Sequence, residues 1–152
     1  MGDISNLVPF LTYYLTENST INALVGGKIE PQDDDLVTDD LIAEKNNTTQ
    51  TCILLEEITS NRKPTVGCNI HGRIEYDISI EIEVRGLRSK AYIRKVADEV
   101  EHLLIGGIPA TEYDGVDYWL LTTVISPRDI KDPDDPVRRR ILTLRGRGFY
   151  AK

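Results

Sequence analysis

The stretch GRIEYDISIEIEVRG, residues 72–86, decides the fold. Every second residue in it is apolar: Ile74, Tyr76, Ile78, Ile80, Ile82 and Val84. Charged or hydroxyl side chains lie between them: Arg73, Glu75, Asp77, Ser79, Glu81, Glu83 and Arg85. Because successive side chains of a strand point to opposite faces, this alternation predicts a long strand over residues 70–85 with one buried face. A strand of this length usually runs past the body of its domain, as part of a protruding ribbon, a hairpin or an intermolecular sheet.

The spacing of the apolar residues changes from every second residue to a helical repeat directly after this strand. Ser89 is a suitable N-cap, and the apolar residues that follow recur at helical spacing: Ile93, Val96, Ala97, Val100, Leu103 and Leu104. Gly106-Gly107 ends the pattern, as expected for a left-handed C-cap. A second amphipathic helix is predicted at the N-terminus, where five residues have the same spacing: Ile4, Leu7, Val8, Leu11 and Leu15.

The remaining segments complete an α+β pattern. They are expected to be a turn at 20–25, an extended piece at 28–31, a strand at 51–58 buried on both faces, strands at 118–126 and 137–150, and a loop at 127–136. We expect two helices packed on one face of a mainly antiparallel sheet, in one domain over residues 1–152. Residues 30–44 hold seven acidic residues and no base, and we expect a mobile acidic loop over 31–50.

Composition restricts the classes of function. The net charge of -7 gives no general attraction to nucleic acid or to anionic membranes. No apolar run is long enough to span a membrane, and the N-terminus lacks the basic region of a signal peptide. Two cysteines do not form a disulfide framework, so the expected compartment is a reducing cytoplasm.

Residues suited to catalysis or metal binding are few. The only potential zinc ligands of the Cys or His type are Cys52, Cys68, His71 and His102. Only Cys68 and His71 are close in sequence, whereas zinc motifs normally supply two tight pairs. In an extended segment these two residues would also point to opposite faces, which is poor geometry for a nucleophile and its base. We therefore predict no catalytic residue, no metal and no cofactor.

Two charged segments are the candidates for function. The acidic ladder comprises Glu75, Asp77, Glu81 and Glu83. Alternation places it on the polar face of a strand, where the simplest interpretation is a solvated sheet face. It could also be an acidic wall that repels DNA in a channel, or a docking strip for a basic partner.

The second segment is basic and lies at residues 137–152. Its arginines are Arg138, Arg139, Arg140, Arg145 and Arg147. Three consecutive arginines on a strand cover both faces, so the strand is either exposed or meets acids of a neighbour. We favour a subunit interface over nucleic-acid binding, because the separation of acids and bases along the chain permits head-to-tail contacts that close into rings.

The order of these segments resembles the tail-terminator, or tail-completion, proteins of long-tailed bacteriophages. The similarity is carried by ISNLVPFLTYYL, NSTINALVGGKIEP, GRIEYDISIEIEVRG, SKAYIRKVADEVEHLLIGG, DYWLLTTVISPRD and RRRILTLRGRGFYAK, and extends from residue 4 to about 150. The acidic stretch 31–50 is longer than this pattern requires.

The resemblance implies a structural protein of the virion, made in the host bacterial cytoplasm. Six copies would form a ring on the head-proximal end of the tail tube, stop its polymerisation and contact the head connector. DNA would pass through the lumen without specific binding. The acidic ladder would face this lumen, and Arg138 to Arg147 would contact other subunits or the tube protein.

Three other classes of function stay open. A head-closure or head–tail adaptor of the same neck region also forms rings. A dimeric ligand-binding or regulatory module would use a pocket between helices and sheet. An enzyme would depend on Cys68 and His71 alone.

Overall fold

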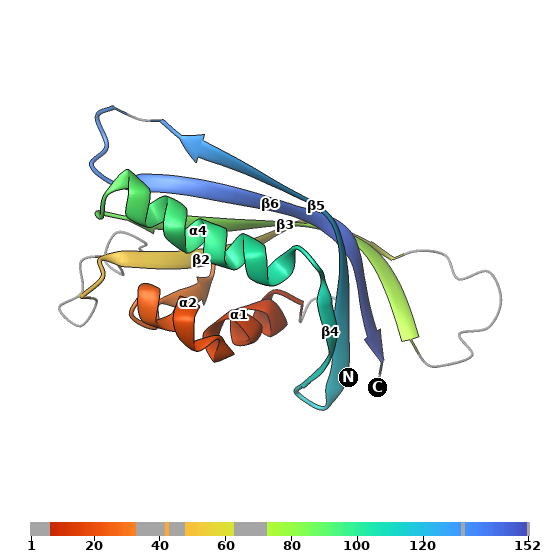
Figure 1. Ribbon diagram of the computed structural model, residues 1–152. Coiled ribbons are helices and arrows are strands. Elements are labelled where there is room, and N and C mark those ends of the chain that lie inside the picture. Colours follow the sequence, from red (N-terminus) through yellow and green to blue (C-terminus); the bar gives the residue numbers. More distant parts are fainter. Residues whose placement is uncertain (1–6, 33–41, 43–47, 63–72, 132, 152) are drawn as a thin grey trace.

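The fold is an α+β layer whose helices cover one face of a curled sheet (Figure 1). The computed structural model describes residues 7–32, 42, 48–62, 73–131 and 133–151. Its helices are α1 (Leu7–Glu17), α2 (Ser19–Leu24) and α4 (Lys90–Leu104). Its strands are β1 (Ile29–Pro31), β2 (Thr51–Arg62), β3 (Arg73–Gly86), β4 (Ile108–Tyr113), β5 (Val116–Ile130) and β6 (Arg138–Ala151). The predicted fold class is thereby confirmed.

The described strands form one sheet in the order β1-β2-β3-β6-β5-β4. All neighbours are antiparallel except β1, which pairs parallel to β2. The strand predicted over 70–85 is β3, and it lies near the middle of the sheet, with residues 70–72 outside the described part. One end of β3 and β6 extends beyond the helical layer (Figure 1).

The main core lies between the helices and the inner face of the sheet, the face that the helices cover. The buried positions of β3 are the alternating ones that the sequence predicts: Tyr76, Ile78, Ile80, Ile82 and Val84. Phe10 of α1 stacks on Tyr118 of β5, with ring centroids 4.9 Å apart. Burial of these apolar surfaces is the dominant favourable contribution to folding.

Helix α4 begins and ends at the predicted residues. The Ser89 side chain accepts a hydrogen bond from the Tyr92 backbone N–H at 3.2 Å, which satisfies one free donor of the first turn. After the helix, Gly107 has φ +83°, and its N–H donates to the Leu104 carbonyl at 2.9 Å. The left-handed conformation and close backbone of Leu120 leave no room for a side chain there.

Three details of the predicted pattern are wrong. The turn expected at 20–25 is helix α2. Its N-cap is Asn18, whose side chain accepts a hydrogen bond from the Ile21 N–H at 3.0 Å. Strand β4 was not predicted. The loop expected from residue 127 begins later, because β5 continues through Ile130, paired with Arg139 of β6. Pro127 is tolerated because this part of β5 lies at the sheet edge.

Strand β2 is buried on both faces at its start, as predicted. Ile53 and Leu55 join the main core, whereas Cys52 and Leu54 form a small cluster with Ile42 on the outer face, the face away from the helices. Of the predicted acidic loop 31–50, residues 33–41 and 43–47 lie outside the described residues.

Candidate assembly surface

The acidic ladder and half of the basic segment lie on the outer face of the sheet. Register pairs Asp77 of β3 with Arg147 of β6, and Arg85 with Arg139. Residues directly opposite each other on paired strands share a face. Glu75, Asp77, Glu81 and Glu83 are therefore interleaved with Arg139, Arg145 and Arg147. The structure brings together two segments of opposite charge that are separated in the sequence.

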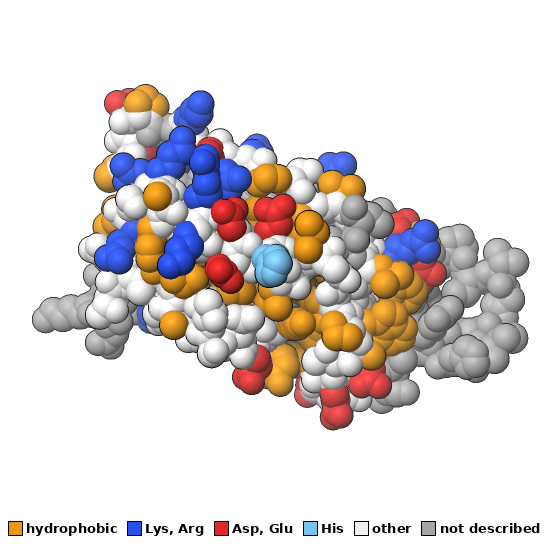
Figure 2. Space-filling model, in the orientation of Figure 1, with side chains coloured by type: hydrophobic (Ala, Val, Ile, Leu, Met, Phe, Trp, Pro, Cys, Tyr) orange, Lys and Arg blue, Asp and Glu red, His pale blue; other side chains and the backbone are white. Residues whose placement is uncertain are grey.

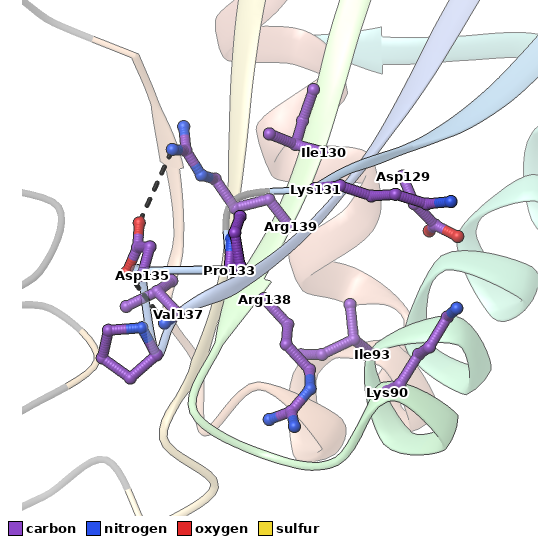
Figure 3. Close-up of a pocket in the computed structure, with 11 residues that line it drawn as sticks. Lys90, Ile93, Asp129, Ile130, Lys131, Pro133, Asp135, Val137, Arg138 and Arg139 are labelled. Carbon is purple, nitrogen blue, oxygen red and sulfur yellow. Dashed lines mark hydrogen bonds and ion pairs between the residues drawn. The ribbon is translucent and has the colours of Figure 1, made fainter.

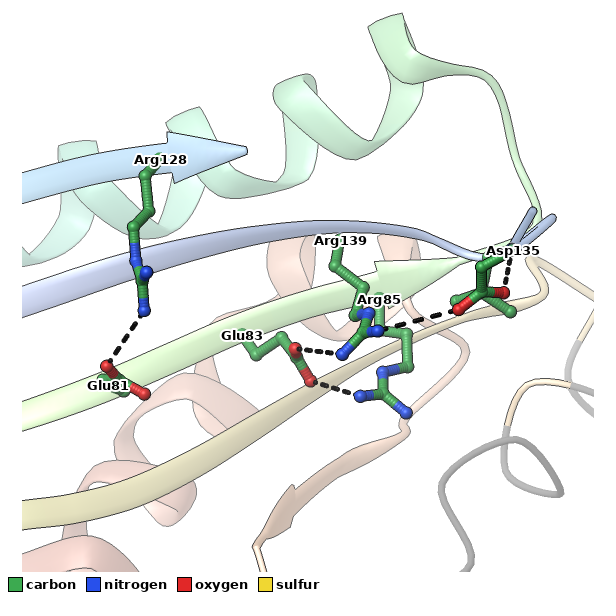
Figure 4. A network of polar contacts seen from close by, with 7 residues as sticks. Glu81, Glu83, Arg85, Arg128, Asp135 and Arg139 are labelled. Atoms are coloured by element: carbon green, nitrogen blue, oxygen red, sulfur yellow. Dashed lines mark hydrogen bonds and ion pairs between the residues drawn. The ribbon is translucent and has the colours of Figure 1, made fainter. Parts of the chain in front are cut away.

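Ion pairs cross this outer face (Figure 4). Glu83 lies 3.1 Å from Arg85 and 3.9 Å from Arg139, and its side chain is only 15% exposed. Arg139 also lies 3.6 Å from Asp135. Because these groups are half-buried, each depends on its partners to offset the loss of hydration.

The ladder continues with more exposed pairs. Glu81 lies 3.4 Å from Arg128 of β5, and Glu75 lies 3.7 Å from Arg147. Glu75, Glu81 and Glu83 are thus each paired with arginines of the same chain. The outer face is a mixed-charge surface, so its acids and arginines largely compensate each other before any second subunit approaches.

The other half of the basic segment lies toward the helices. Arg140 of β6 donates a hydrogen bond at 2.8 Å to Asp129 of β5. This hydrogen bond lowers the pKa of the Asp129 carboxyl below its ordinary value of 3.8. Burial has a smaller, opposing effect, and the positive charges of Arg140, Lys90 and Arg94 lower the pKa further. Arg138 donates to the Arg88 carbonyl at 3.2 Å. The prediction that Arg138–Arg140 cover both faces of a strand is confirmed.

A pocket of about 670 Å³ lies where α4 begins and the β5–β6 connection passes (Figure 3). Its lining includes the cations Lys90, Lys131, Arg138 and Arg139 and the acids Asp129 and Asp135. Figure 2 shows Lys and Arg side chains gathered at this end of the molecule. The pocket has an excess of positive charge, which suits an anionic group.

An aromatic pair at the other end of the outer face was not predicted. Trp119 of β5 stacks on Phe149 of β6 with ring centroids 5.3 Å apart and nearly parallel planes. Leu121 and Val124, further along β5, are about half exposed. The alternation of residues 117–121 within an antiparallel sheet could have placed Trp119 and Leu121 on one face. It could not have shown which strand lies beside them.

The residues considered for metal binding or catalysis are dispersed. Cys52 is buried on the outer face of β2, so its predicted burial is confirmed. His102 lies exposed in the last turn of α4. Cys68 and His71 lie outside the described residues. Within the described part of the chain, no three potential ligands gather.

Comparison with known proteins identifies the fold. No protein-family model and no curated protein matches the chain. A solved chain from the virion of a native gene transfer agent particle superposes with a TM-score of 0.54, at 14% identity, over 91% of each chain. A second solved structure, 10% identical over 98% of this chain and 96% of its own, has a TM-score of 0.44, too low to support an argument. None of the described helices is long and apolar enough to cross a membrane.

Proposed function

We propose that this chain is a structural protein of a phage-type virion. The observation that carries the proposal is the similarity of fold with a virion chain over 91% of both chains, because nearly every element takes part. The mixed-charge outer face agrees with a structural role, since Glu75, Glu81 and Glu83 are held in ion pairs within the chain. We expect no catalytic activity and no cofactor.

The finer proposal is a tail terminator. In this role, a ring of copies, six by the family resemblance, caps the head-proximal end of the tail tube and ends tube polymerisation. The partners are further copies of the chain, the tail tube protein and the head connector. The order of helix, long strand, helix and paired strands supports this role over that of a head-closure adaptor.

The outer face is the candidate for the lumen wall. Because arginines lie between its acids, this face differs from the purely acidic, DNA-repelling wall that the sequence suggested. A wall of paired acids and bases neither attracts nor strongly repels phosphates. Such a surface suits DNA that must slide without specific binding. Arg145 and Arg147 are exposed on this face, whereas Arg138 is exposed at the opposite side of β6. On this assignment Arg145 and Arg147 would face the lumen with the acidic ladder, so Arg138 is the predicted arginine best placed for contacts with other subunits or with the tube.

Two measurements test the proposal together. Native mass spectrometry should give a hexamer, alone or with tail tube protein present. Electron microscopy of purified tail tubes should show the protein at one end only, with shorter and more uniform tubes when it is added during assembly. Binding along the whole tube, or binding to the head connector but not to the tube, would contradict a terminator and favour an adaptor.

The pocket beside Lys90, Lys131 and Arg138 supports a second candidate, a ligand-binding module. It predicts a stable dimer whose thermal unfolding midpoint rises with a small anionic ligand, because a ligand that binds only the folded state stabilises it. A hexamer indifferent to phosphates and dicarboxylates would contradict this candidate.

A further inference from the structure

Two strands of the sheet have unpaired edges in the described structure. Strand β2 pairs with β3 along its length, but on its other side β1 covers only Ile53–Leu55. Strand β5 pairs with β6 along its length, but β4 covers it only as far as Leu120. Among the described residues, segments 56–62 of β2 and 121–130 of β5 therefore present backbone groups with no strand beside them. Such edges readily pair with another chain.

The two edges have compatible directions. Strands β2, β3, β6 and β5 alternate in direction, so β2 and β5 run antiparallel to each other. A second copy placed beside the first in the same orientation would therefore set its β2 antiparallel to β5. The sheet would continue from one subunit to the next with its alternation intact.

Register limits how the edges can meet. Face must be matched with face, because a slip of one residue would reverse every side chain. When the bulge between Glu57 and Thr59 and the bulge between Thr122 and Val124 are counted, two registers obey this rule and keep segment 56–62 on unpaired residues of β5, namely 122–128 and 125–130. The first places Glu56 of one copy opposite Arg128 of the next, an opposite-charge pair across strands, and the contact ends there because β1 covers Leu55.

Side chains on both edges suit a protein partner. Ile58 on β2 and Leu121 and Val124 on β5 are 48%, 50% and 49% exposed, and they are three of the six most exposed large apolar residues described. In the register 122–128, Ile58 lies at the bulge of β2, beside Ser126 and Pro127 of the next copy and between two and three residues along the strand from Val124. Arg128 is 58% exposed, although it lies 3.4 Å from Glu81 of its own chain. Apolar and charged groups therefore complement each other across the same contact.

We propose that copies of this chain assemble head to tail by pairing β2 of one copy with β5 of the next. The contact is heterologous, so it repeats around a ring if the rotation closes and extends as a filament if it does not. The proposal rests on the proposed ring function and adds the surfaces that form the ring. Pro127 lacks a backbone N–H, so the intermolecular ladder has one hydrogen bond fewer there than its length allows.

Cysteine cross-linking tests this contact. In a Cys68→Ser background, the double variant Ile58→Cys with Val124→Cys is treated with a short bismaleimide and separated under denaturing conditions. We expect a ladder of covalent multimers that ends at the size of the ring. Each single variant should stay monomeric, and a mixture of the two single variants should give dimers only. Ile58→Cys with Ile105→Cys is the matched control, because Ile105 is 58% exposed on a helix end.

The possible outcomes distinguish a failure of the β2–β5 contact from a failure of the ring proposal. A native hexamer that gives no ladder would overturn the β2–β5 contact and leave the tail-terminator proposal standing. Cross-linking by Val124→Cys alone or by Ile58→Cys alone would indicate a two-fold contact and also overturn it. Absence of any oligomer, alone or on tail tubes, would overturn both. Circular dichroism of every variant verifies that the fold is retained.

Discussion

The two faces of β3 carry side chains from the same fourteen residues and have opposite physical character. On the inner face, Ile80 and Val84 are fully buried under the helices. On the outer face, Glu81 and Glu83 are held by arginines from β3, β5 and β6. The inner face supplies most of the stability by excluding water, whereas the outer face contributes less and stays available for contacts with other molecules.

The largest effect is expected on the inner face. Ile80→Ala should lower the free energy of unfolding by about 2–5 kcal/mol, because it removes buried methyl groups and leaves a cavity. Denaturant titration followed by circular dichroism measures the change. The neighbouring Ser79→Ala, on the outer face, is the control and should stay within about 0.5 kcal/mol of the original protein. Equal losses for both variants would contradict the division between the faces.

A smaller loss is expected for Glu83→Lys. The new ammonium would lie beside Arg85 and Arg139 and leave both without their carboxylate, at an expected cost of about 1–3 kcal/mol. Asp117→Lys, at an exposed position of β5 on the same face, is the matched control. If the two variants were equally stable, the ion pairs of Glu83 would not contribute to folding.

Asp129→Asn should cost about 1 kcal/mol at neutral pH, because it removes the charged partner of Arg140. The Asp129 pKa is lowered on folding, so its contribution is present above the ordinary value of 3.8 and disappears as the pH falls through the lowered value. Denaturation curves of both proteins at several pH values should therefore converge in acid. A difference that stays undiminished or grows at pH values well below 3.8 would contradict this assignment.

The smallest effect on stability is expected for Glu81→Lys. Its carboxylate is 28% exposed and its partner Arg128 is 58% exposed, so the change should stay within about 0.5 kcal/mol. If the outer face lines the lumen, the added positive charge should slow DNA ejection while the ring keeps its mass. Normal infectivity with an intact ring would remove the lumen assignment. Glu83 is unsuitable for this test, because its reversal would disturb the fold as well.

Regular periodicity explains which elements could be predicted from the sequence. Strand β3 and helix α4 each have an uninterrupted pattern, so their type and buried residues follow from spacing alone. Strand β4 was missed because it is only six residues long and contains Pro109. Asp114-Gly115, both at positive φ, is the typical two-residue hairpin turn and was the available signal.

The candidate surface could be predicted only in part. Alternation places Glu81 and Glu83 on the polar face of β3, and this placement is what the structure shows. Their partners on other strands come from β5 and β6, and the register that joins Asp77 to Arg147 depends on the strand order of the whole sheet. No periodicity along the chain contains that order, so the charge compensation could not be read from the sequence.

The position of β6 also determines when the protein can fold. This strand lies between β3 and β5, yet residues 138–151 are the last of the described strands to be synthesised. During translation, the edge of β3 that later pairs with β6 therefore stays uncovered until about sixty further residues have left the ribosome. Contacts so distant in sequence also make folding slow. We expect the emerging chain to depend on chaperones that shield β3, and folding to be completed only after β6 is released.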